Sequence, residues 1–168
     1  PSEISSVKSH FDYRILNKDG ETVVSGTSIW SIINVETGRP ELISDHCEIV
    51  GESGQRHPRN MIEAVTHSDL DFKYITNISD IDFNGHVHNV SYLKIALSAI
   101  PYELSKTNVL KKMVIKFLRQ SFINETLTCS IEKDAEDLSA HSSICNEAGQ
   151  EVCRISVSMQ SVESLDFA

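Results

Sequence analysis

The segment at residues 89–99 constrains the fold of this chain most, because it is apolar on nearly every side and is followed by Pro101. Proline cannot continue a helix, so the segment is predicted to be one helix that stops there. A helix without a polar face has to be surrounded by the rest of its domain.

Runs typical of β-strands lie on both sides of this predicted helix. One precedes it at residues 71–78, and four follow at residues 110–118, 126–132, 139–145 and 151–159. One strand, a helix and four consecutive strands predict an α+β unit in which an antiparallel sheet wraps around a central helix, the hot-dog fold. A different α+β sandwich, with the helix lying on one sheet face, fits the same order of elements.

The first 45 residues are also predicted to form β structure. Residues 11–16 alternate apolar and polar side chains, residues 17–20 supply a turn, and residues 22–35 are rich in β-branched side chains. Because an isolated pair of strands is only marginally stable, we expect these strands to add to a larger sheet. Residues 46–67 lack sustained periodicity and are predicted to be a linker, which leaves residues 68–163 as the second domain.

Composition argues against several classes of protein. The 24 acidic residues outnumber the 15 basic ones, and the net charge of −9 repels nucleic-acid backbones. The four cysteines form no Cys-x-x-Cys pair, which argues against a zinc knuckle or a disulfide framework and favours reduced thiols in a cytosolic-type compartment. No apolar run approaches the roughly 18 to 20 residues that cross a bilayer, so we expect no membrane span, and the first residues are not typical of a signal peptide.

A short motif lies just before the predicted helix and in its first turn. Its members are Asp82, Asn84, His86, Val87, Asn89 and Tyr92. They match the pattern Asp-x-Asn-x-His-Val-Asn-Asn-x-x-Tyr, and the run resembles the signature of the acyl-acyl carrier protein (acyl-ACP) thioesterases. These are hot-dog enzymes whose chains carry two hot-dog repeats. His88 stands where the family usually has Asn.

The resemblance extends beyond the motif. Segments 18–20, 28–30 and 37–40 are similar to the closing strands of the family's N-terminal repeat. The resemblance therefore implies that residues 1–45 close an incomplete first repeat and that residues 68–163 form the whole second repeat. With Pro1 as its first residue, the chain is expected to be the C-terminal portion of a longer thioesterase, or a naturally shortened relative.

Thioester hydrolysis needs a polarised carbonyl, a positioned water and an acceptor for its proton. By the resemblance, Asn84 and His86 hold the carbonyl and the water, and Asp82 orients or activates them. Residues two apart in an extended loop project to one side, and free amides at the helix start can donate to the oxyanion. A neutral His86 near a carboxylate could itself act as the base.

One departure from the family bears on activity. A segment of the family resembling Tyr-Arg-Arg-Glu-Cys carries a further acidic residue that is proposed to help activate water. Here the matching segment is 117–121, and Gln120 replaces that Glu. An amide can orient water but cannot accept its proton, so either Asp82 and His86 suffice as the base or the protein is a weak enzyme.

Other interpretations of the same residues stay open. Asp82 and Asn84 could be turn residues that cap the helix, with His86 as a hydrogen-bonded residue at its entry. His86, His88 and Asp82 could instead ligate a metal if an irregular backbone let them converge. A basic cluster at positions 111, 112, 116 and 119 could contact an acyl carrier protein or be a solvated strand face.

The resemblance implies a hydrolase that releases fatty acid from acyl-ACP in fatty acid biosynthesis. We expect it to use no cofactor and no metal and to meet acyl carrier protein as its partner, without nucleic acid or membrane. We further expect a homodimer in the cytoplasm, or in the plastid if the chain is from a plant. The alternative is a non-catalytic hot-dog subunit that binds acyl thioesters or serves in dimerisation. A hydratase of the same fold fits the motif less well.

Overall fold

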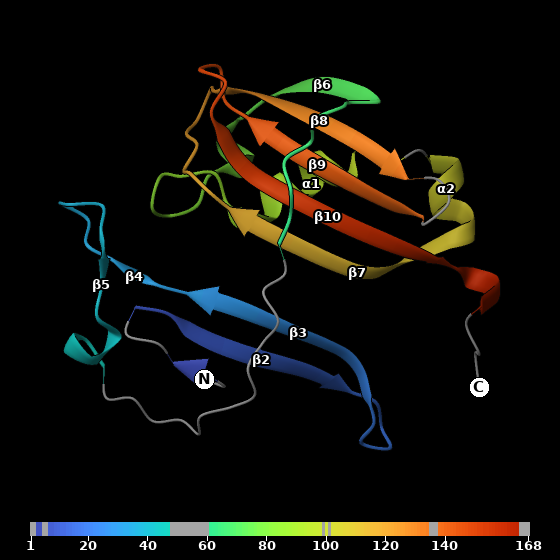
Figure 1. The fold of residues 1–168 in the computed structure, drawn as a ribbon, viewed down its shortest axis with the longest axis horizontal. Helices are drawn as coiled ribbons and strands as arrows, with labels where there is room; N and C mark the ends of the chain where they lie inside the picture. Colours follow the sequence, from blue (N-terminus) through green and yellow to red (C-terminus); the bar gives the residue numbers. More distant parts are fainter. Residues whose placement is uncertain are drawn as a thin grey trace. The chain divides into compact units, whose positions relative to one another are not determined.

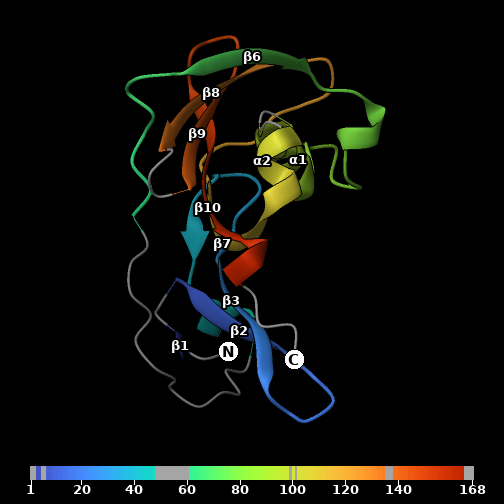
Figure 2. The ribbon, with the colours of Figure 1, turned by 90° about the vertical axis from the view of Figure 1, so that its right-hand side faces the viewer.

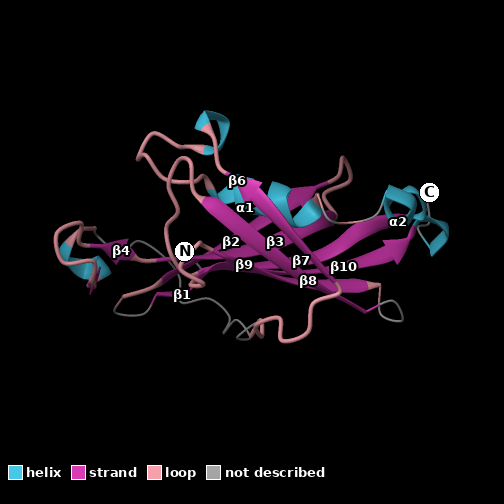
Figure 3. Ribbon diagram, turned by 90° about the horizontal axis from the view of Figure 1, so that it is seen from above, coloured by secondary structure: helices cyan, strands magenta, loops and turns pink. Residues whose placement is uncertain are grey.

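The computed structural model describes residues 3–4, 7–47, 61–98, 100, 102–134 and 138–164 of the chain (Figure 1). Contacts divide the chain into two compact units, residues 1–59 and 60–168. Of the predicted linker, residues 48–60 lie outside the described part. Strands outnumber helices throughout (Figure 3).

The second unit is built on one antiparallel sheet. Its strands and helices are β6 (Leu70–Ile75), η2 (Ile78–Asp80), α1 (Asn89–Leu97), α2 (Tyr102–Thr107), β7 (Asn108–Phe117), β8 (Thr126–Asp134), β9 (Ser139–Cys145), β10 (Glu151–Ser161) and η3 (Val162–Ser164). The strand order is β6-β8-β9-β10-β7, so β6 and β7 are the two edges. Figure 2 shows the sheet curving around α1. This is the predicted hot-dog fold.

The core lies between α1 and the concave face of this sheet. Strand β8 buries every second side chain, at Leu127, Cys129 and Ile131, which is the period of two expected of a strand with one buried face. Helix α1 contributes Tyr92 and Ile95, which lie on the same side of the helix. Burial at this spacing fixes which way the helix faces.

The prediction that the rest of the domain surrounds the helix holds for one face only. Val90 is 48% exposed, and Asn89 and Lys94 are exposed as well. The helix ends at Leu97, before the predicted position 99, which like Pro101 lies outside the described residues. Ser98 follows it, and its hydroxyl donates a 2.7 Å hydrogen bond to the carbonyl of Lys94.

The first unit contains the predicted hairpin. Its elements are β1 (Glu3–Ile4), β2 (Ser9–Leu16), β3 (Thr22–Trp30), β4 (Ile32–Ile33), β5 (Pro40–Glu41) and η1 (Ile43–Asp45). In the turn between β2 and β3, the Asn17 side chain accepts from the amides of Asp19 and Glu21, and Gly20 takes a φ of +83°. Within the described residues of this unit the strands pair as β1-β2-β3 and β4-β5, and their addition to a larger sheet stays a prediction.

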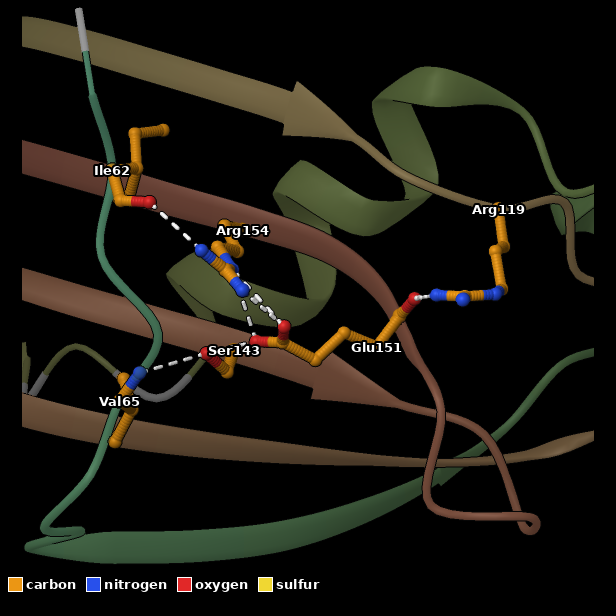
Figure 4. Close-up of polar contacts among 6 residues, drawn as sticks. All are labelled: Ile62, Val65, Arg119, Ser143, Glu151 and Arg154. Carbon is orange, nitrogen blue, oxygen red and sulfur yellow. Dashed lines mark hydrogen bonds and ion pairs between the residues drawn. The ribbon is translucent and has the colours of Figure 1, made fainter.

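A strap of chain, residues 61–66, crosses the face of the second unit's sheet opposite to α1 (Figures 1 and 2). Figure 4 shows the polar contacts that hold it. Arg154 on β10 donates from Nη1 to the Ile62 carbonyl at 3.0 Å and pairs with Glu151. The Ser143 hydroxyl on β9 donates to Glu151 and accepts from the Val65 amide, each at 3.0 Å. The end of the predicted linker is therefore fixed to the sheet by two strands.

The four cysteines form no disulfide with one another in the described part of the chain. Cys129 and Cys153 are buried, Cys145 is partly buried and Cys47 is exposed. No helix in the described part of the chain is long and apolar enough to cross a membrane.

Candidate active site

The motif loop before α1 is a closed turn that is held by the carboxylate of Asp82. Its Oδ1 accepts hydrogen bonds from the main-chain amides of Asn84 at 2.8 Å and His86 at 3.2 Å. The Asp82 amide donates to the His86 carbonyl at 2.9 Å, and Gly85 takes a φ of +79°. The backbone is thus a turn and not the extended loop in which residues two apart project to one side, because the Asp82 side chain and Gly85 allow it to fold back on itself. Asp82 is a turn residue, as the alternative interpretation proposes, but the residue that caps the helix is His88.

The turn brings the charge of Asp82 close to two of the other predicted site residues. Loss of water around the carboxyl raises the pKa of Asp82. The amides of His86 and Asn84, the Asn84 side chain and the charge of His86 outweigh this effect and hold the pKa below its ordinary value. Asp82 is therefore a carboxylate at neutral pH.

The side chains of Asn84 and His86 are open to a ligand. Asn84 is exposed and His86 is partly buried. The His86 ring lies against the ring of Phe122, with 5.2 Å between the centroids and a tilt of 58°. Within the described residues the imidazole has no hydrogen-bond partner, so both of its nitrogens are available to a water or a substrate.

The amides at the start of α1 are mostly occupied, contrary to the expectation that they are free. His88 is the N-cap, and its Nδ1 accepts from the Val90 amide at 3.0 Å. The amides of Val87 and His88 donate to the carbonyls of Ser121 and Asp80. Only the Asn89 amide in this stretch lacks a partner among the described residues. One main-chain donor, rather than several, is available for an oxyanion.

A family model, the acyl-ACP thioesterase C-terminal domain, matches residues 62–161. The chain belongs to the acyl-ACP thioesterase family. This confirms the family indicated by the Asp82 to Tyr92 motif.

Comparisons with single proteins and with solved structures agree with this family assignment. An acyl-ACP hydrolase of Cuphea viscosissima, FATB3, chloroplastic, is 30% identical over 111 residues, which are 60% of this chain and 27% of that protein. Among solved structures, an acyl-ACP thioesterase from Bacteroides thetaiotaomicron gives a TM-score of 0.80 at 22% identity, and the 12:0-ACP thioesterase from Umbellularia californica gives 0.81 at 18%. Each covers 95% of this chain, whereas the chain spans 65% of either structure. At these identities, the two structures show the shared fold.

Gln120 of this thioesterase-family chain lies directly before Ser121, whose carbonyl holds the Val87 amide. The Gln120 side chain is exposed and makes no hydrogen bond in the described part of the structure. Ser121 is fully buried, so its hydroxyl is not accessible as a nucleophile. A hydrogen bond between main-chain atoms therefore connects the motif loop to the segment that carries Gln120.

The predicted basic cluster is only partly free. The Arg119 guanidinium donates to the Glu151 carbonyl at 2.9 Å, whereas Lys111, Lys112 and Lys116 are exposed along β7. The three lysines remain candidates for contact with an acidic partner.

A buried carboxylate that the sequence interpretation did not assign lies beneath the motif. Asp80 is 3% exposed, and its oxygens accept from the Tyr74 hydroxyl, at 2.9 Å for the nearer one, and from the Asn77 amide at 2.9 Å. Asn77 and Asp80 form a capping box around η2, and this three-residue spacing is the signal in the sequence that could have revealed it. In the described residues, no three His, Cys, Asp or Glu side chains are placed to hold a metal ion.

Proposed function

We propose that this chain is the catalytic portion of an acyl-ACP thioesterase, which hydrolyses fatty acyl-ACP to free fatty acid in fatty acid biosynthesis. The observation that carries the proposal is the turn in which the Asp82 carboxylate holds the main chain of His86 while the His86 imidazole stays open. A partly exposed imidazole beside a carboxylate is a pair of groups that can act as a general base and the charge that stabilises its protonated form.

The proposed reaction uses groups of this chain alone. His86 takes a proton from water as the water oxygen bonds to the thioester carbonyl carbon, and Asp82 stabilises the imidazolium. The Asn84 side chain and the Asn89 amide donate to the oxygen that becomes negative, and the exposed Gln120 amide orients the water. The intermediate then expels the thiolate of the carrier, which takes the proton back from His86. Neither a cofactor nor a metal is required.

The wider assignments belong to the same proposal. Residues 68–163 would be the C-terminal hot-dog repeat, and residues 1–45 the closing strands of the repeat before it. Acyl carrier protein would be the partner, with its acidic surface near Lys111, Lys112 and Lys116. We propose a homodimer in the cytoplasm or, by analogy with the chloroplastic relative, in a plastid.

The rival function is a non-catalytic hot-dog subunit that binds acyl thioesters or serves in dimerisation. Gln120 favours this non-catalytic function, because it replaces the family's glutamate at position 120 and an amide cannot accept a proton from water.

Hydrolysis of acyl-ACP thioesters by the purified chain tests the proposal. His86→Ala should lower kcat by about 10² to 10⁴, the usual range for a lost acid/base group. Folding should survive, because the His86 side chain is only partly buried and makes no hydrogen bond in the described part of the chain, where it contacts the Phe122 ring. A matched control is His46→Ala, since His46 lies outside the motif and pairs with Glu41. Equal rates in the wild type and His86→Ala would overturn the catalytic assignment.

A further inference from the structure

The imidazole of His86 lies against an aromatic ring from a segment that is distant in sequence. The centroids of the His86 and Phe122 rings are 5.2 Å apart, and the two rings are tilted by 58°. Aromatic rings attract one another in tilted arrangements at centroid separations of about 4.5–7 Å. The hydrogen bond from the His86 amide to Asp82 fixes only the main chain of His86, so the contact with Phe122 is the one that acts on the imidazole itself.

The main chain around Phe122 is held on both sides. Before it, the Ser121 carbonyl accepts from the Val87 amide at 2.8 Å. At Phe122 itself, the carbonyl accepts from the hydroxyl of Thr76 at 2.6 Å, and Thr76 is fully buried directly after β6. After it, the Asn124 amide donates to the Thr76 carbonyl at 3.0 Å. Residues 121–124 are therefore attached both to the motif loop and to the end of β6.

The Phe122 side chain stands at the surface although its main chain is fixed. It is 47% exposed, so its ring contributes less to the hydrophobic core than a buried phenylalanine would. A half-exposed ring on a fixed main chain presents a firm apolar surface to the neighbouring imidazole. It can also be replaced with a smaller loss of stability than a buried ring.

We propose that Phe122 is a positioning residue, whose ring holds the His86 imidazole in the orientation in which it meets the attacking water. Asp82 fixes the main chain of His86, and Phe122 fixes its side chain. Rotation of a histidine ring about its last side-chain bond is only weakly restricted by the bond itself, so without Phe122 the imidazole would spend less time in the productive orientation. The effect on hydrolysis rests on the proposed thioesterase function, whereas the effect on the imidazole does not.

Nuclear magnetic resonance of the full chain without substrate tests the orientation. In the wild type, nuclear Overhauser contacts should join the rings of His86 and Phe122, and the coupling constants of the His86 side chain should correspond to one rotamer. In Phe122→Leu these couplings should approach averaged values, whereas Phe122→Tyr, which keeps the ring, should preserve the single rotamer. Averaged couplings in the wild type, or a single rotamer in Phe122→Leu, would overturn the proposal.

Kinetics test the consequence for catalysis. Phe122→Leu should lower kcat about tenfold with little change in KM, as a small misplacement of a catalytic group does, and Phe122→Tyr should restore most of the rate. The matched control is Phe83→Leu, which removes a 97% exposed ring and should leave both constants unchanged. A raised KM with unaltered kcat in Phe122→Leu would mean that the ring binds substrate, and it would overturn the positioning role. An equal loss of kcat in Phe83→Leu would overturn it as well.

The two experiments separate the positioning role from the proposed function. A wild type without hydrolysis would refute the proposed function, and the coupling constants would still decide whether Phe122 orients the imidazole. Denaturant unfolding of each variant shows whether a lost rate comes from a lost fold. If Phe122→Leu does not fold, Phe122→Met, which also lacks the aromatic ring, replaces it in both experiments.

Discussion

The main-chain amide of Val87 donates a 2.8 Å hydrogen bond to the carbonyl oxygen of Ser121. This bond joins the turn that contains Asp82 and His86 to the segment that contains Gln120, two parts of the chain that are distant in sequence. Gln120 directly precedes Ser121 in that segment, so a carboxylate can be introduced there without altering the residues of the turn.

Gln120→Glu should raise the rate of thioester hydrolysis or shift its pH dependence toward lower pH. In the proposed reaction, a glutamate at this position can accept the proton of the attacking water, which the amide cannot. The measurement is kcat against pH for both proteins on one acyl-ACP substrate. Gln150→Glu, in the exposed β9–β10 turn, controls for added charge. A purely binding protein would stay inert with either residue at position 120.

Asp82→Asn should weaken the motif turn, and the effect should depend on pH. The pKa of folded Asp82 lies below the unfolded value of about 3.9. The stabilisation by Asp82 is therefore fully present above the unfolded value and is lost as pH falls through the lower folded pKa. The Tm difference between wild type and variant, measured from pH 7 downward, should shrink across that window. A pH-independent difference would show that the carboxylate charge does not hold the turn.

His88→Ala should destabilise the second unit by about 0.5–2 kcal/mol, the usual effect of a lost N-cap. The Val90 amide would lose its acceptor at His88 Nδ1. His88→Asn should retain most of the stability, because Asn is a strong N-cap and is the residue that the family usually has here. Urea unfolding of the three proteins measures both effects. Equal losses in the two variants would mean that His88 contributes something other than the cap.

Arg154→Ala should release the strap at residues 61–66 and cost about 1–3 kcal/mol, the range for hydrogen bonds to charged groups. It removes the ion pair with Glu151 and the bond to the Ile62 carbonyl. Hydrogen exchange should show faster exchange at Val65, whereas the amides of β8 keep their protection. Arg154→Lys should not restore the contacts of the strap, because lysine cannot make the bidentate hydrogen bonds to the Glu151 carboxylate.

The same network predicts a loss of stability in acid. The hydrogen bond from Arg154 contributes most to holding the pKa of Glu151 below its ordinary value of about 4.3. It outweighs partial burial, which raises this pKa. The stabilisation of the folded protein by the Glu151 carboxylate is present above the pKa that Glu151 has in the unfolded chain. It disappears as the pH falls through the lower pKa of Glu151 in the folded protein. The Tm difference between the wild type and Arg154→Ala should therefore narrow below about pH 4.

Thiol labelling at pH 8 should distinguish the cysteines. Burial raises the pKa of Cys129 and of Cys153 to about 12, so almost no reactive thiolate forms in the folded protein. Cys47 is exposed and should be alkylated first, as mass spectrometry of the digested protein can show. Cys129 and Cys153 should react only after denaturant is added. Rapid labelling of either one in the native protein would contradict the core described above.

The sequence by itself determined the elements whose signals are local. The β9–β10 hairpin is an example: Asn146 and Gly149 mark the turn, and in the structure the Asn146 side chain accepts from Gln150 while Gly149 takes a φ of +73°. Runs of residues typical of strands predicted β8 and β10. An apolar run followed by proline predicted α1. The six-residue helix α2 was not predicted, because so short a helix shows no complete period.

Only the tertiary structure decided what depends on contacts between distant segments. The sequence indicated Asp82 as a member of the motif and allowed both an extended loop and a turn at this residue, and only the structure decided for the turn. The strap depends likewise on Arg154 and Ser143 meeting across two strands. A sequence pattern fixes which face of a strand or helix is apolar, whereas strand register and helix packing decide which polar groups meet.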